Sequence, residues 1–130
     1  ITEGFIMLSS YLEWVTKFME SWKALDGIKT AELLSKDVDY YETPNGEPCA
    51  SWDEVLELWK VVPCNQRDIT YSFDIICYTQ EVCIVNWKMK RVFINGTEES
   101  KQVIDGIFQI SLDNEGKCKF FKQWRHTEVV

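Results

Sequence analysis

Three side chains in this sequence could move or polarise a proton near neutral pH: Asp105, Tyr41 and His126. Asp105 is either a buried acid with a raised pKa or an outward carboxylate that pairs with Lys88 or Lys90 across a sheet. His126 is the only histidine, and its position near the chain end also suits a surface or interface residue. Tyr41 can donate its hydroxyl to a carbonyl, or it is a core tyrosine with its tip at the surface. Together they predict cofactor-free acid–base chemistry on a carbonyl or enol-like molecule.

The sequence lacks the residue patterns that are typical of phosphate binding, metal binding and catalytic triads. It contains no glycine-rich phosphate-binding loop and no His-x-x-x-His or Glu-x-x-His pair. A single histidine also gives no basis for choosing a Ser-His-Asp triad. We therefore predict neither a bound metal nor a cofactor.

The composition argues against two classes of partner. A formal net charge of -7 and a pI of about 4.7 repel a phosphate backbone, so nucleic acid is not expected. No apolar run approaches the roughly 20 residues that span a bilayer, and the first residues lack the features of a signal peptide. The five cysteines are odd in number and show no Cys-x-x-Cys spacing, which favours reduced thiols in the cytoplasm.

The spacing of apolar residues, which predicts the elements that carry the three candidate side chains, differs between the two halves of the chain. In the first half, apolar residues recur at helical spacing, beginning with an aromatic stripe in a helix over residues 10–25. Asp26-Gly27 breaks this helix, and a second short helix leads to a strand over residues 38–42. Thr43-Pro44-Asn45-Gly46 ends that strand. Ser51-Trp52-Asp53-Glu54 has the capping-box pattern and begins a third helix.

In the second half, apolar residues alternate with polar ones, as in strands. We expect strands over residues 69–77, 82–93, 103–112 and 118–127, with hairpins at Asn95-Gly96 and at 113–117. Helices followed by a long antiparallel run predict one α+β domain over residues 1–130, with helices on one face of a curled sheet. Both sheet faces are partly apolar, so we expect a second copy of the chain on the other face, as a homodimer.

This order of elements is similar to that of the nuclear transport factor two-like superfamily, which includes SnoaL-like cyclases and ketosteroid isomerases. The resemblance covers nearly the whole chain. The segments that show the resemblance most clearly are Trp-Lys-Ala-Leu-Asp at 22–26, the segment 33–46 that ends in Thr-Pro-Asn-Gly, Asp-Asn-Glu-Gly-Lys at 113–117, and Gln123-Trp124. It implies a cone-shaped, cystatin-like α+β roll with the N-terminal helices on the concave face of a curved antiparallel or mixed sheet. The superfamily hosts many activities, so the motifs identify a fold better than a reaction.

The resemblance also implies positions for catalytic groups. The general base of ketosteroid isomerases precedes the strand-ending Pro, where this chain has Thr43, and their oxyanion-donating tyrosine falls at Phe18. The third position, a neutral acid, is Asp105 when counted from the preceding turn and Phe108 when counted from the following one. The two countings put opposite faces of the strand inward. Steroid isomerisation is therefore not expected.

The predicted ligand is a small hydrophobic molecule held between sheet and helices in an aromatic-lined pocket. The predicted chemistry is of the isomerase, cyclase or dehydratase kind, and the alternatives are a ligand-binding module without turnover and a dimerisation platform. Tyr41 should point toward the same cavity as Thr43. The tryptophans at 14, 22, 59 and 87 also fit a packed core. The residues predicted to contact the ligand are Phe18, Trp22, Thr43, Trp59 and Trp124.

Overall fold

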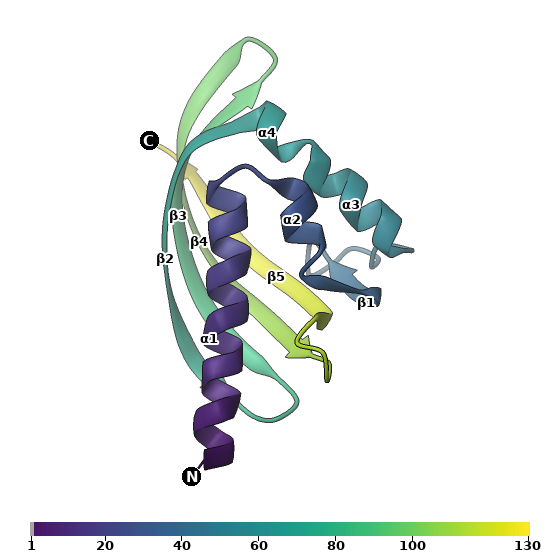
Figure 1. Cartoon of the computed structure of the whole chain (residues 1–130). Coiled ribbons are helices and arrows are strands. Elements are labelled where there is room, and N and C mark those ends of the chain that lie inside the picture. The colour runs from purple at the N-terminus through teal and green to yellow at the C-terminus, as the bar shows by residue number, and fades with distance from the viewer. Residues whose placement is uncertain (1) are drawn as a thin grey trace.

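The computed structural model of the chain describes residues 2–130, without the side chains of residues 2, 3, 5 and 6. The helices are α1 (Thr2–Lys23), α2 (Gly27–Ala31), α3 (Trp52–Lys60) and α4 (Val62–Asn65). The strands are β1 (Leu34–Tyr41), β2 (Gln66–Tyr78), β3 (Cys83–Asn95), β4 (Glu98–Leu112) and β5 (Cys118–Val129). The predicted α+β fold with N-terminal helices on a curved sheet is confirmed (Figure 1).

The sheet is mixed and open, with the strand order β1-β5-β4-β3-β2. β1 pairs with β5 in parallel, and the other neighbours pair antiparallel. The long strands curl around α1, which lies along the concave face, while α3 and α4 lie toward one end of that face (Figure 1). The result is a cone whose helices cover its inside.

The break between α1 and α2 depends on a leucine in a left-handed conformation. Leu25 has a φ of 59°, and the following amide of Asp26 donates to the carbonyl of Ser21 at 2.9 Å. This arrangement satisfies the last carbonyls of the helix as a glycine would. Asp26 then caps α2, since its Oδ1 accepts from the amide of Lys29 at 3.1 Å.

A glycine allows α2 to approach α3 closely. A Cβ added to Gly27 would lie 1.9 Å from the carbonyl oxygen of Trp59, so no larger residue fits there without a backbone shift. At the start of α3, the Ser51 Oγ accepts from the amide of Glu54 at 3.3 Å, as the capping-box pattern predicts. The Glu54 carboxylate accepts from the amide of Ala50 rather than from that of Ser51. These contacts set the position of Trp59 on α3.

The centre of the cone is filled by stacked aromatic rings. Trp87 stacks on Phe108 at 4.9 Å between ring centroids, and Phe18 meets Phe108 edge-on at 5.5 Å. Gly106 lies opposite Trp87 in the β3–β4 register, and a Cβ there would come within 2.6 Å of the indole. Each such ring pair contributes about 0.5–1.5 kcal/mol beyond the burial of its area. The interior is therefore packed, and any ligand must lie at its edge.

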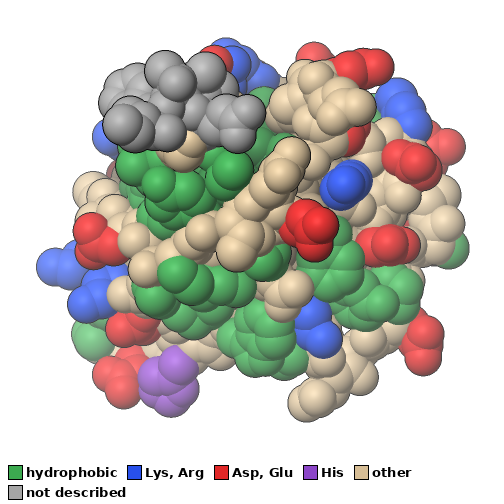
Figure 2. Space-filling model, turned by 90° about the horizontal axis from the view of Figure 1, so that it is seen from below, with side chains coloured by type: hydrophobic (Ala, Val, Ile, Leu, Met, Phe, Trp, Pro, Cys, Tyr) green, Lys and Arg blue, Asp and Glu red, His purple; other side chains and the backbone are tan. Residues whose placement is uncertain are grey.

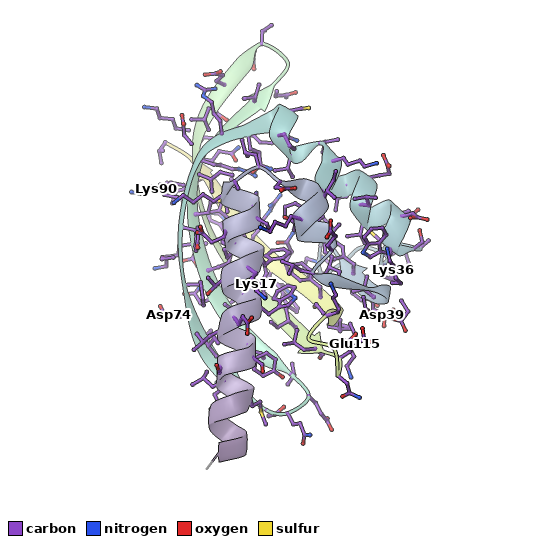
Figure 3. The ribbon with its side chains drawn as sticks, viewed as in Figure 1. Lys17, Lys36, Asp39, Asp74, Lys90 and Glu115 are labelled. Atoms are coloured by element: carbon purple, nitrogen blue, oxygen red, sulfur yellow. The ribbon has the colours of Figure 1, made fainter. Side chains whose placement is uncertain are left out.

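The two faces of the sheet alternate strictly along β4. Phe108 is fully buried against α1, while Asp105 is exposed on the convex face. The sequence left open whether Asp105 or Phe108 points into the cone. In the structure, Phe108 is the inward residue. Asp74 on β2 and Lys90 on β3 likewise project from the convex side (Figure 3).

Charged and hydrophobic side chains mix on the surface of the molecule. Seen from the end of the cone that carries the start of α1, basic and acidic side chains are interspersed with hydrophobic ones, and no basic patch covers that face (Figure 2). Within residues 2–130, no helix is both long and apolar enough to cross a membrane. All five cysteines are free thiols.

Candidate ligand-binding site at the mouth of the cone

A pocket of about 240 Å³ opens where the end of α1, the α3–α4 segment and the sheet meet. We call it the mouth pocket. Its volume lies just below the range of roughly 300–1,000 Å³ that holds drug-sized ligands, so a small molecule would fill it. Its apolar wall is made by Trp22, Trp59 and Phe93, and its polar wall by Glu42, Arg91, Gln123 and Arg125.

The polar wall is built around the carboxylate of Glu42. Alternation along β1 sends Tyr40 and the following Glu42 to the concave side. The Tyr40 hydroxyl donates to Glu42 Oε2 at 2.8 Å, and Gln123 Nε2 donates to Glu42 Oε1 at 3.0 Å. The Tyr40 hydroxyl in turn accepts from Trp59 Nε1 at 3.1 Å. The carboxylate is thus held in one orientation by two buried donors.

Burial raises the pKa of Glu42 above its ordinary value, and the donors and the two arginines only partly offset this effect. Burial also raises the pKa of Tyr40 well above its ordinary value, and the neighbouring Glu42 adds to the shift. Tyr40 therefore remains a neutral donor at physiological pH. A carboxyl group with a raised pKa, fixed at a pocket wall, is suited to accept and return a proton.

Two arginines face this carboxylate. Arg91 is only 7% exposed, its Nε donates to Gln102 Oε1 at 3.0 Å, and its guanidinium lies 4.9 Å from the ring centre of Phe93. Burial and the nearby Arg125 lower the pKa of Arg91 to about 10, against the opposite effect of Glu42. Arg125 itself is exposed at the pocket rim. The pocket thus places two positive charges around one carboxyl group.

The rest of the lining has both satisfied and unsatisfied polar groups. Trp22 Nε1 donates to Gln66 Oε1 at 2.9 Å, which fixes the indole against the pocket. Asn65 Oδ1 is buried and has no hydrogen-bond partner among the described residues. An unpaired buried oxygen at a pocket wall is a ready acceptor for a ligand or a water molecule.

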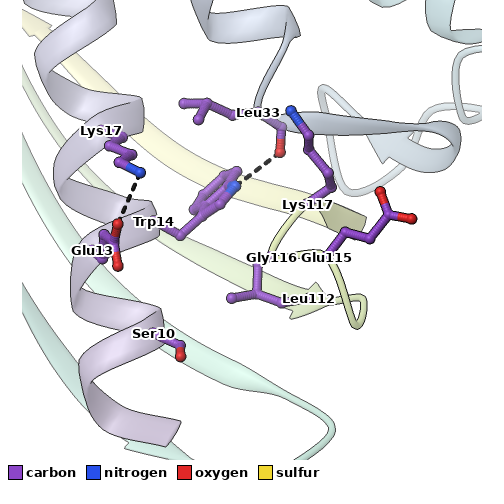
Figure 4. A pocket seen from close by; sticks show the side chains of 9 residues that line it. All are labelled: Ser10, Glu13, Trp14, Lys17, Leu33, Leu112, Glu115, Gly116 and Lys117. Carbon is purple, nitrogen blue, oxygen red and sulfur yellow. Dashed lines mark hydrogen bonds and ion pairs between the residues drawn. The ribbon is translucent and has the colours of Figure 1, made fainter. Parts of the chain in front are cut away.

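A second pocket, of about 270 Å³, lies between α1 and the β4–β5 turn (Figure 4). Several of its polar groups make structural contacts: Trp14 Nε1 donates to the Leu33 carbonyl at 2.9 Å, and Lys17 pairs with Glu13 at 2.8 Å. Both members of this ion pair are largely exposed, so water screens their charges. The mouth pocket, with the buried Arg91 and the half-buried Glu42 in its wall, is the better candidate for chemistry.

The structure places the predicted ligand contacts in three different environments. Trp22 and Trp59 line the mouth pocket. Phe18 is fully buried in the aromatic core beneath them. Thr43 is exposed in the loop after β1, and Trp124 is 37% exposed on the convex face. The expected direction of Trp124 is corrected by its neighbours, since Gln123 and Arg125 point to the pocket instead.

The structure does not bring the three predicted catalytic groups to the mouth pocket. Asp105 and His126 are partners in the β4–β5 register and are both exposed on the convex face. Asp105 accepts from Asn86 Nδ2 at 2.8 Å, and His126 lies 3.2 Å from Glu128.

Tyr41 also lies on the convex face, with its ring 5.6 Å from that of Phe120. It was expected to share a cavity with Thr43. The correction follows from alternation, because Tyr40 and Glu42, the residues on either side of Tyr41, point to the concave side and Tyr41 therefore points to the convex side.

Sequence reasoning missed Glu42, Tyr40 and the two arginines. Val38 and Tyr40 alternate with Asp37 and Asp39, a pattern that could have identified the inward side of β1. In β5 simple alternation fails. Ser111 pairs with Phe120 whereas Leu112 pairs with Cys118, so β5 has one extra residue, and the residues after 119 point to the opposite face from the one that alternation predicts.

Sequence comparisons find no relatives, whereas structural comparisons find many. No protein-family model matches this sequence, and no curated protein matches it. The epoxide hydrolase/cyclase-like enzyme SalBIII, which acts in pyran ring formation in the polyether salinomycin, has a TM-score of 0.77 at 12% identity, over 91% of this chain and 94% of its own. A protein from Novosphingobium aromaticivorans named as a scytalone dehydratase has a TM-score of 0.78 at 12% identity, over 100% and 92%. A ketosteroid isomerase-like protein from Erwinia carotovora atroseptica has a TM-score of 0.71 at 11% identity, over 89% and 93%.

These similarities confirm the predicted resemblance. The chain has the cone fold that these cyclase-like, dehydratase and ketosteroid isomerase-like proteins share with a nuclear transport factor two-like protein. At identities of 11–12%, the comparisons establish the fold and leave the reaction to the residues of the site.

Proposed function

We propose that this chain binds a small, largely hydrophobic molecule in the mouth pocket and exchanges a proton with it through Glu42, in cofactor-free chemistry of the isomerase, cyclase or dehydratase kind. The observation that carries the proposal is a half-buried carboxyl group, held by two buried hydrogen-bond donors and with a raised pKa, at the wall of an aromatic pocket. Structural neighbours named for cyclase, dehydratase and isomerase activities support the same class of reaction.

The proposed mechanism uses the contacts of the pocket in order. The apolar ring of the ligand lies against Trp22 and Trp59. This position brings the carbon that is adjacent to the ligand's carbonyl group close to Glu42. Glu42 in its ionised form removes a proton from this carbon and later returns it to the same or a neighbouring atom. Tyr40 and Gln123 hold the carboxylate in place, so that little reorganisation accompanies the transfer. Asp105, Tyr41 and His126, on the convex face, take no part in this mechanism.

The proposal can be tested by deuterium exchange. In D₂O, the purified protein should accelerate exchange of the α-protons of 2-tetralone, followed by proton NMR. Glu42→Gln should reduce this acceleration by about 10²-fold or more, the typical contribution of a general base. Asp105→Asn, on the convex face, is the matched carboxylate control and should leave the rate unchanged. If Glu42→Gln keeps the full rate, the proposed role of Glu42 is wrong.

The second candidate is a ligand-binding module without turnover. It is favoured by Phe18 and Phe108, which fill the two positions where the isomerase resemblance would place an oxyanion donor and a neutral acid, and which contact each other in the core. In that case the tetralone should bind the wild-type protein, as measured by calorimetry, without any acceleration of exchange.

We also propose that a second copy of the chain covers the convex face. Tyr41, Phe120 and Ile107 are half-buried there beside the exposed Trp124. Lys122 lies 5.1 Å and 5.3 Å from the ring centres of Tyr41 and Trp124. This face carries charges of both signs around an apolar strip, which suits pairing with itself about a two-fold axis. Sedimentation should give a dimer that Trp124→Glu converts to a monomer, and a wild-type monomer would refute it.

The proposed location is the cytoplasm. It is supported by the free state of all five cysteines, two of which are exposed.

A further inference from the structure

The charges around the mouth pocket are unbalanced. The chain has a net charge of -7, yet two of its three arginines line this one pocket. The single carboxyl group between them, that of Glu42, already accepts hydrogen bonds from Tyr40 and Gln123. Within residues 2–130, neither Arg91 nor Arg125 forms an ion pair with a carboxylate.

Arg91 is the more informative of the two arginines. A charged side chain that is 7% exposed normally has a partner of opposite charge, because an uncompensated buried charge is costly. Among the described residues, Arg91 donates a hydrogen bond only through Nε, to the neutral Gln102. Its two terminal nitrogens remain available as donors, and Arg125, at the rim of the same pocket, repels rather than compensates it.

From this arrangement we infer that the molecule held in the mouth pocket is an organic acid, whose carboxylate is bound by Arg91 and Arg125 while its apolar body lies on Trp22 and Trp59. The inference rests on the proposed function and names the class of its ligand. The planar fork of a guanidinium matches the two oxygens of a carboxylate. The apolar wall selects a hydrophobic acid over an inorganic anion, and the unpaired Asn65 Oδ1 offers an acceptor for a polar group on its body.

The rim of the pocket fits such a molecule. Leu58 is 37% exposed and Val61 is 51% exposed, and both line the pocket. They extend the apolar wall toward solvent, so that the body of the acid need not be enclosed completely. This fits a pocket volume of about 240 Å³, which is small for a ligand with more than two rings.

The test compares 2-naphthoate with 2-naphthamide, which has the same shape without the charge, by isothermal titration calorimetry. Wild-type protein should bind the carboxylate at least tenfold more tightly than the amide. Arg125→Gln and Arg91→Met should each remove most of this preference. Arg67→Gln is the matched control, because Arg67 pairs with Glu99 at 2.5 Å outside the pocket and its loss changes the net charge equally.

The Glu42→Gln variant separates this inference from the proposed function. Removing the carboxylate beside the arginines should increase the affinity for 2-naphthoate several-fold, while the exchange of 2-tetralone protons is lost. If the affinity rises and the exchange rate is unchanged, the inference stands and the role of Glu42 as a base falls. If the exchange is lost and the carboxylate gains no affinity, the inference falls and the base remains.

Four further outcomes would overturn the inference. One is equal affinity for the amide and the carboxylate, and another is no binding of either at millimolar concentration. The third is a preference that Arg67→Gln reduces as much as Arg125→Gln does, since this would indicate a general charge effect. Inorganic phosphate that competes as well as 2-naphthoate would mean that the site binds simple anions and not organic acids.

Discussion

The concave and convex faces of the sheet are made by the same strands, yet the concave face is buried under helices and the convex face is exposed. On β4, the fully buried Phe108 packs against α1, while Asp105 three residues earlier is exposed and bonds to Asn86. The concave face buries aromatic rings and keeps its polar groups in one network around Glu42. The ionisable groups of the convex face lie at the surface. Water there hydrates their charges, which avoids a desolvation penalty and weakens the interactions that could make them reactive. Burial, rather than residue type, therefore distinguishes the candidate site.

The largest expected difference between the two faces is in stability. Phe108→Ala should lower the free energy of unfolding by about 3–5 kcal/mol, because it removes a fully buried ring that contacts Phe18 and Trp87. Asp105→Ala, on the same strand, should change it by roughly 0.5 kcal/mol or less. Urea unfolding followed by tryptophan fluorescence measures both. Equal losses in the two variants would contradict the assignment of the faces.

The second difference concerns the polar network around Glu42. Glu42→Leu leaves the Tyr40 hydroxyl and Gln123 Nε2 without their acceptor, and each unsatisfied buried donor costs about 1–3 kcal/mol. Glu42→Gln should cost less, because an amide keeps an acceptor oxygen for Tyr40 and Gln123 can turn its own amide.

The control on the convex face is Glu128→Gln, whose partner His126 is exposed. It should leave the urea midpoint unchanged. If Glu42→Leu is as stable as wild type, the network contributes nothing to folding and its geometry would have no structural purpose.

Most of the fold could be predicted from the sequence because periodicity reports which side of an element is buried. The aromatic stripe of α1 and the alternation of β3 and β4 gave the helices-then-strands order and the curved sheet. The start of α1 could not be placed, since the helix begins at Thr2 whereas the apolar stripe becomes regular only near residue 10. Patterns therefore located the elements better than their ends.

The candidate site was less predictable, for two physical reasons. Trp22 and Trp59, whose helical spacing indicated their direction, line the mouth pocket, and their contact with a ligand stays a prediction. The inward direction of Gln123 and Arg125 was not found, because a register shift in β5 reverses the face that its later residues present. In addition, an acid such as Glu42 looks like any surface glutamate until the strands and helices that bury it are assembled.

The smallest difference is expected in the pH dependence of stability. The pKa of Glu42 is raised in the folded state by burial, so the folded protein binds this proton more tightly than the unfolded chain. Below the ordinary value of 4.5, both states are protonated and Glu42 has no effect on stability. As the pH rises from 4.5 through the raised pKa, the unfolded state loses its proton first and wild-type stability should fall relative to Glu42→Gln.

The measurement is a set of urea titrations of both proteins between pH 4 and pH 8, compared as a difference so that all other titrating groups cancel. A difference between wild type and Glu42→Gln that stays constant with pH would mean that Glu42 titrates normally. The concave face would then hold its carboxylate no differently from the convex face, and burial would not be what makes the mouth pocket reactive.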